Sequence, residues 1–140
     1  MTRRLTVLAA GVLLSAGCVP LLGHHSFSAE FDASKPVKIV GVVTKVEWTN
    51  PHTHFYVDSQ AENGKAINWE LELGSPNMLQ REGWNRHSLN PGDHVLVDAF
   101  LARDGSKLAN VRDLRIADGR RVYIGFAGRN TPALGTTPVP

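Results

Sequence analysis

The sequence lacks the second cysteine needed for a disulfide and several motifs that form common catalytic and phosphate-binding sites. It contains a single cysteine, Cys18, so no internal disulfide can hold the folded domain together. It contains no glycine-rich phosphate loop, no metalloprotease spacing of two histidines around a glutamate, and no nucleophile elbow. These absences argue against nucleotide-dependent and hydrolytic chemistry, and we expect the protein not to be an enzyme.

The chain has one long apolar run, and this run lies at the N-terminus. Residues 5–19 are mostly apolar, follow Arg3 and Arg4, and end at Pro20. Such a segment is typical of a secretory signal and is shorter than the roughly 20 residues that cross a bilayer. We predict a signal peptide at residues 1–23 and an exported protein of the periplasm or cell envelope. A buried N-terminal helix is the competing interpretation.

Two cleavage sites fit this signal. Residues 15–18, SAGC, resemble a lipobox, and cleavage there would leave a lipidated Cys18 that tethers the protein to a membrane. Cleavage after Gly23 would instead make His24 the first residue of the mature chain. The sequence leaves both sites open.

Charge of neither sign is in excess in the mature chain. The whole sequence has 15 lysines and arginines against 13 aspartates and glutamates, and the signal removes Arg3 and Arg4 but no acidic residue. A formally neutral, exported domain lacks the basic surface of nucleic-acid-binding proteins. We therefore expect no nucleic acid among its partners.

Hydrophobic alternation predicts a series of strands in the middle of the mature chain. Apolar residues recur there with a period of two, and turn-forming pairs such as Asn63-Gly64 and Asp104-Gly105 separate the runs. A leader of uncertain structure is expected at residues 24–36, one domain at residues 37–125, and a flexible tail at residues 126–140. The strands are expected at residues 37–48, 55–59, 66–73, 94–101, 108–116 and 122–124.

A short helix is expected between the third and fourth strands. Ser75 is a good N-cap, Pro76 suits the first helical position, and Gly83 is placed to end the helix. Gly41 stands where the alternation of the first strand changes phase, which indicates a bulge or a sharp bend. This order of elements predicts an all-β, OB-fold-like small barrel. A different small β-sandwich or barrel is the competing interpretation.

Seven short motifs are spread over the mature chain: HHSF at 24–27, EWTNPH at 47–52, GSPN at 74–77, GW at 83–84, PGD at 91–93, DG at 104–105 and AN at 109–110. Together they resemble a family of exported bacterial proteins classed as a domain of unknown function. The resemblance implies an exported protein and a domain that spans most of the mature chain, and it implies no activity. One position departs from the family pattern, because an apolar or aromatic residue is expected at His54, which argues against a metal role for that histidine.

The histidines suggest a metal site. His24 at a new N-terminus could chelate an ion through its amine, whose ordinary pKa is about 7.7–8.0, and its ring nitrogen, and His25 or His52 could complete the site. Amine and imidazole nitrogens suit copper(II), which makes copper the candidate cofactor. The alternative is that His24 and His25 are solvated on a mobile leader. His87 and His94 have no partner spacing and are interpreted as structural or surface residues.

The loops of an OB-like fold suggest a ligand site beside these histidines. The loop between strands one and two and the loop between strands four and five border the usual ligand surface, so Asn50, Arg103 and Asp104 are candidate ligand-binding residues. Trp48 at the end of the first strand is a candidate for stacking on a ligand. Glu70 and Glu72 share the polar face of the third strand, where we expect a solvated surface.

Two functions remain open from the sequence. The first is a non-catalytic binding protein of the envelope that takes a small ligand or a metal ion, copper in particular, on its OB-like face. The alternative is an accessory or structural protein that acts by contact with another envelope protein.

Overall fold

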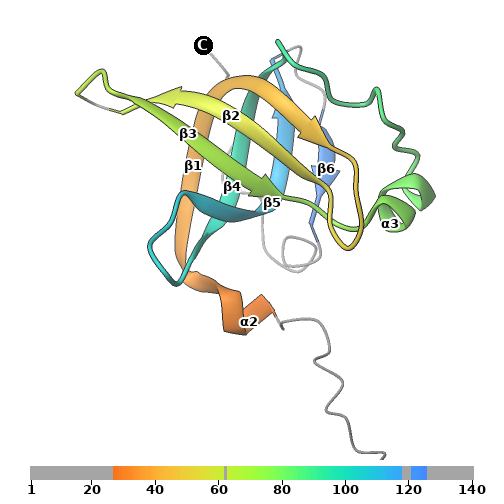
Figure 1. The fold of residues 1–140 in the computed structure, drawn as a ribbon, viewed down its shortest axis with the longest axis horizontal. Coiled ribbons are helices and arrows are strands. Elements are labelled where there is room, and N and C mark those ends of the chain that lie inside the picture. The colour runs from red at the N-terminus through yellow and green to blue at the C-terminus, as the bar shows by residue number, and fades with distance from the viewer. Residues whose placement is uncertain (1–26, 62, 118–120, 126–140) are drawn as a thin grey trace, which may run out of the picture.

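The computed structural model describes residues 27–61, 63–117 and 121–125, and all structural statements below concern these residues. The strands form one curled sheet in the order β3-β2-β1-β4-β5-β6 (Figure 1). The elements are α2 (Phe27–Glu30), β1 (Phe31–Glu47), β2 (His54–Gln60), β3 (Ala66–Glu72), α3 (Pro76–Arg81), β4 (His94–Ala102), β5 (Leu108–Ile116) and β6 (Arg121–Ile124).

A parallel pairing of β3 with β5 joins the two ends of the five-stranded part of this sheet. Glu70 pairs with Leu108 and Glu72 with Asn110, while all other strand pairs are antiparallel. The strands then follow one another as β1-β2-β3-β5-β4, which is the arrangement of a small OB-like barrel and confirms the fold predicted from the sequence. The enclosed core includes Val43, Phe55, Val57, Leu71, Leu79, Val95, Val97, Val111 and Leu114.

β1 takes part in both halves of the barrel, and Gly41 is the residue at which the halves meet. Gly41 pairs with Ser59 of β2 and with Val95 of β4. A Cβ atom at Gly41 would lie 2.2 Å from the backbone oxygen of Asp58, so only glycine lets β2 approach this closely. The irregularity in pairing falls between Val43 and Lys45 rather than at Gly41, because the extra residue there is Thr44.

The N-terminal part of the domain begins earlier than the alternation indicated. β1 starts at Phe31 rather than at residue 37, so part of the expected leader is helix α2 and strand. The aromatic ring of Phe27 lies 5.7 Å from that of Phe31 and 5.8 Å from that of Phe100, centroid to centroid. The residues between Phe31 and Val37 show no hydrophobic alternation, so the sequence pattern does not predict a strand there. Aromatic contacts of Phe27 with Phe31 and Phe100 hold this segment in place instead.

The short helix α3 has the predicted ends. The hydroxyl oxygen of Ser75 accepts a hydrogen bond from the backbone N–H of Met78 at 3.3 Å, and Pro76 occupies the first turn. Gly83 follows the helix with a φ of 88°, which a residue with a side chain rarely adopts. Within the described residues no helix has the length and hydropathy to cross a membrane.

Candidate functional site

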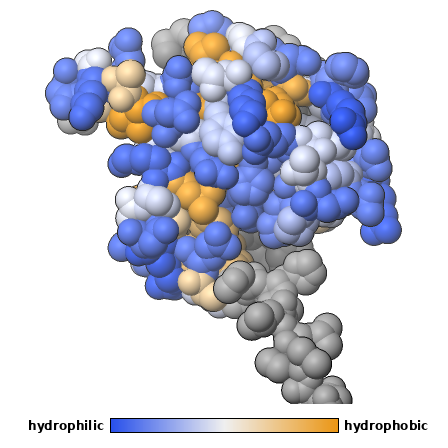
Figure 2. Space-filling model, in the orientation of Figure 1, coloured by the Kyte–Doolittle hydropathy of each residue, from blue (hydrophilic) through white to orange (hydrophobic). Residues whose placement is uncertain are grey.

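The outer face of β2 and β3 carries a continuous set of polar side chains, which we call the polar strip. Inward residues such as Phe55, Leu71 and Trp69 alternate along these strands with outward polar ones. Figure 2, in the orientation of Figure 1, shows that most of this face is hydrophilic. The polar strip includes neighbouring side chains of other segments, and its members are His54 and Tyr56 of β2, Glu70 and Glu72 of β3, Lys45 and Glu47 of β1, His52 of the loop before β2, and Asn110 of β5.

At one end of the polar strip, side chains from three different segments contact one another in a row, and we call this set the relay. Asn110 on β5 donates a hydrogen bond from Nδ2 to Oε1 of Glu72 at 2.9 Å. The other carboxylate oxygen of Glu72 lies 3.4 Å from Nδ1 of His52 in the loop between β1 and β2. Glu72 is only 7% exposed, so the expectation that it stands on a solvated face is wrong. Neighbouring side chains from the loop and from β5 cover it.

The other part of the polar strip surrounds Tyr56 and His54. The Tyr56 hydroxyl contacts Oε2 of Glu47 at 3.1 Å and Oε1 of Glu70 at 3.3 Å. Oε1 of Glu70 also lies 2.9 Å from Nδ1 of His54, although the angle does not suit a hydrogen bond. Hydrogen bonds from Lys45, and then from Tyr56, hold the pKa of Glu47 below its usual value.

Tyr56 provides a prediction about pH that is independent of any ligand. Burial, followed by the hydrogen bond to Glu47, raises the pKa of Tyr56 from 10.0 to about 12. Because the folded-state pKa is the higher one, the stability that Tyr56 contributes is complete below pH 10.0 and is lost as the pH rises toward about 12. We expect Tyr56→Phe to remove this part of the alkaline decrease in unfolding free energy.

The measurement is simplified by the sequence, which has only two tyrosines, Tyr56 and Tyr123. In Tyr123→Phe, the tyrosinate absorbance should therefore report Tyr56 alone, with a midpoint close to pH 12. A midpoint near the ordinary value of 10.0 would show that the hydroxyl is not shielded by the polar strip.

The loop between β1 and β2 holds two further candidates from the sequence. Asn50 is exposed and is joined to Pro51 by a cis peptide bond. Trp48 is partly buried and packs against the core, so less of its ring is free for stacking on a ligand than we expected. The other two tryptophans, Trp69 and Trp84, are buried in the core. His52 is thus the loop residue that joins the polar strip.

Arg103 and Asp104, the candidates from the loop between β4 and β5, have partners away from the histidines. Arg103 donates a hydrogen bond from Nε to the backbone oxygen of Ser28 at 2.9 Å, and it lies 3.6 Å from a carboxylate oxygen of Asp32. Hydrogen bonds from Ser106 lower the pKa of Asp104 and close its own turn. In these contacts Arg103 ties the loop to the beginning of β1.

The remaining histidine candidates are only partly covered by the structure. His24, His25 and Cys18 lie outside the described residues. His87 and His94 are exposed. Among residues 27–61, 63–117 and 121–125, no group of three or more His, Cys, Asp and Glu side chains could hold a metal ion. The polar strip therefore offers two imidazoles beside carboxylates but not a complete metal site.

These features define the class of the protein as a small OB-like β domain with a histidine- and carboxylate-lined outer face. Its sequence matches the model of a family of unknown function, DUF6152, over residues 12–110, which is more than half of the chain. The chain therefore belongs to this family. No curated protein shows significant similarity to it.

One solved structure with a similar fold is the mitochondrial single-stranded DNA-binding protein Rim1 of S. cerevisiae. It is 15% identical, with a TM-score of 0.46, and the match covers 61% of this chain and 93% of that one. The prediction that excluded nucleic acid is contradicted by this finding and is withdrawn. At this identity and TM-score, the likeness does not show that the present chain itself binds DNA.

Proposed function

We propose that this protein is a non-catalytic binding protein of the cell envelope that holds a copper ion at the polar strip, with His52 as its principal ligand. The relay from Asn110 through Glu72 to His52 is the observation that carries the proposal. Histidines that bind metals usually have their second ring nitrogen held by a carboxylate, which orients the ring and raises its basicity. Here Glu72 faces Nδ1, so Nε2 is the nitrogen left to bind an ion.

The charges of the polar strip support a cation as ligand. It carries the carboxylates of Glu47, Glu70 and Glu72 against the single ammonium group of Lys45. His54 occupies the outward position next to His52, since the buried Thr53 between them points inward. The two imidazoles thus lie on one face, and imidazole suits copper(II), which stands at the top of the divalent affinity order.

Donors from the leader would complete the site. Because the described residues do not supply three ligands, the proposal also requires His24 or His25, in keeping with the N-terminal chelate inferred from the sequence. This part of the proposal rests on export and on cleavage after Gly23, because only that cleavage frees the amine of His24.

The test begins with protein purified from an exporting host. Its intact mass should correspond to a chain that starts at His24, and a mass that still includes residues 1–23 would contradict export. Copper(II) titration by calorimetry should then give affinities at least about tenfold weaker for His52→Ala and for His24→Ala than for the unaltered protein, as expected for loss of one ligand.

Matched controls separate the site from general surface binding. His87→Ala and His94→Ala remove exposed histidines that do not belong to the polar strip and should leave the copper affinity unchanged. His54→Ala should weaken binding less than His52→Ala, because Tyr56 and Glu70 already occupy its surroundings. Equal affinities for the unaltered protein and for His52→Ala would rule out the proposed site.

A further inference from the structure

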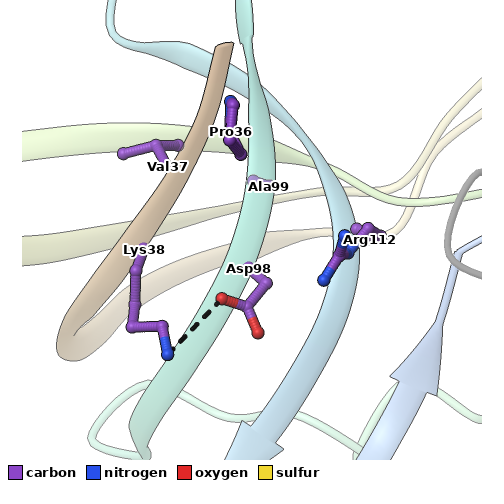
Figure 3. A pocket seen from close by; sticks show the side chains of 6 residues that line it. All are labelled: Pro36, Val37, Lys38, Asp98, Ala99 and Arg112. Carbon is purple, nitrogen blue, oxygen red and sulfur yellow. Dashed lines mark ion pairs between the residues drawn. The ribbon is translucent and has the colours of Figure 1, made fainter. Parts of the chain in front are cut away.

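A separate cavity lies at the junction of β1, β4 and β5. Its volume is about 190 Å³, and Figure 3 shows the side chains around it. In that view Lys38 and Asp98 point toward each other across β1 and β4, while Arg112 comes from β5. The lining residues are Pro36, Val37, Lys38, Asp98, Ala99 and Arg112.

Arg112 is the unusual member of this group. It is only 7% exposed, and its guanidinium carbon lies 5.9 Å from the centroid of the Phe100 ring. Within the described part of the chain its guanidinium group has no hydrogen bond and no ion pair. A guanidinium group has five N–H donors, and no nitrogen of Arg112 is among the fully buried side-chain atoms that lack a partner, so the group is reachable from the cavity that it lines. The cavity is the place from which an acceptor can reach it.

The backbone of β5 explains how Arg112 comes to line the cavity. Asp98 pairs with Asp113, and the next residue, Ala99, pairs with Val111, so Arg112 is the extra residue of a β-bulge. Bulges redirect a side chain out of the regular alternation and occur often beside functional sites. The bulge thus breaks the regular alternation of side chains along β5 and turns Arg112 toward the cavity.

The charges and walls of the cavity define the ligand that would fit. Lys38 Nζ lies 3.9 Å from Oδ1 of Asp98, so one ammonium group, one guanidinium group and one carboxylate leave a net positive charge. Pro36, Val37 and Ala99 supply apolar contact. Since a water takes about 30 Å³ in the liquid, this volume holds roughly six non-hydrogen atoms, the size of a four-carbon carboxylic acid.

We propose that this cavity binds a small monocarboxylate whose carboxylate pairs with the guanidinium group of Arg112 and whose short chain contacts Pro36, Val37 and Ala99. Planar, bidentate pairing is the preferred mode of arginine with carboxylates and supplies acceptors for two of its unmatched donors. Lys38 adds attraction from the cavity mouth, where its side chain is 42% exposed. This site is separate from the polar strip and does not depend on copper.

The test uses butyrate as the probe and NMR spectroscopy of the protein purified from an exporting host. Butyrate should shift the methyl signals of Val37 and Ala99 and the Nε–H signal of Arg112, with a dissociation constant on the order of 1 mM. Butylamine, which has the same chain and the opposite charge, should shift none of these signals. Equal shifts with both probes, or none with butyrate, would overturn the proposal.

Variants identify the group that recognises the carboxylate. Arg112→Gln should weaken butyrate binding by about tenfold or more, through loss of charge-assisted hydrogen bonds. Because Arg112 is buried and its variant could fail to fold, Lys38→Met is the second variant, and it should weaken binding about threefold through loss of an exposed charge. Arg86→Gln, on the exposed surface, is the control and should bind as the unaltered protein does.

Inorganic phosphate distinguishes carboxylate recognition from general attraction of anions. It should compete with butyrate only weakly, because it cannot use the apolar walls. Competition by phosphate as strong as that by butyrate would show a general anion site and overturn the assignment to a carboxylate. Butyrate binding that survives Arg112→Gln in a folded protein would exclude the guanidinium group as the recognising group.

Discussion

Gly41→Ala is expected to lower the free energy of unfolding by about 3 kcal/mol or more, a large part of the roughly 5–15 kcal/mol that stabilises a domain. The added Cβ would lie 2.2 Å from the backbone oxygen of Asp58 and 2.6 Å from a side-chain carbon of Val57. The Asp58 oxygen is held in the ladder between β1 and β2, so it cannot move aside without breaking the pairing on which the barrel depends. Chemical denaturation followed by tryptophan fluorescence measures the change.

The matched control for Gly41 is a glycine whose surroundings are open. Gly64 has a φ of 76°, and a Cβ atom added there would meet no other atom within 4 Å. Gly64→Asn should therefore cost only about 1 kcal/mol, because asparagine tolerates that backbone conformation. If Gly41→Ala unfolds at the same denaturant concentration as Gly64→Asn, the close approach of β1 and β2 at Asp58 is wrong.

Glu72→Gln is expected to weaken copper binding by roughly 10–100-fold while the fold remains intact, the effect typical of removing a residue that orients a metal ligand. Glutamine keeps an oxygen that can accept from Asn110, so the contact to β5 survives. It replaces the carboxylate that faces Nδ1 of His52 with a neutral amide, so the ring loses the partner that fixes its orientation. Glu72 is therefore a positioning residue for His52 in the proposed site.

Two readouts separate this role from a structural one. The nitrogen NMR shifts of His52 should change in Glu72→Gln without copper, because they report which ring nitrogen carries the proton. Glu82→Gln, on an exposed residue at the end of α3, is the control and should leave both the shifts and the copper affinity unchanged. Unchanged copper affinity in Glu72→Gln, together with a large loss in His52→Ala, would contradict the orienting role.

Much of the fold could be predicted because its signals are local. Alternation along β3 placed Trp69 and Leu71 inside and Glu70 outside, and the structure confirms this. Ser75 and Pro76 located α3 because capping chemistry acts within one helical turn. The order of strands and helix then led to an OB-like barrel, since few small folds share that order.

The candidate site could be predicted only in part, because its contacts join distant segments. The spacing of His52 and His54 indicated that they share a face. Nothing in the sequence indicated that Asn110 would reach Glu72, or that Glu72 would be covered and face His52. The opposite error concerns Arg103: its loop borders the expected ligand surface, but its side chain contacts Ser28 of α2 and Asp32 at the start of β1.

Alternation, turn pairs and capping residues are properties of neighbours along the chain, and they were sufficient for most of the strands, for α3 and for the type of barrel, but not for α2 or the start of β1. The absence of a second cysteine likewise excluded an internal disulfide from the sequence alone. The pairing of β3 with β5, the bulge that turns Arg112 toward its cavity, and the contacts that bring Asn110, Glu72 and His52 together arise only when the sheet curls and brings distant residues together. Both proposed sites depend on that curvature, because each draws its side chains from strands that are not consecutive in the sequence.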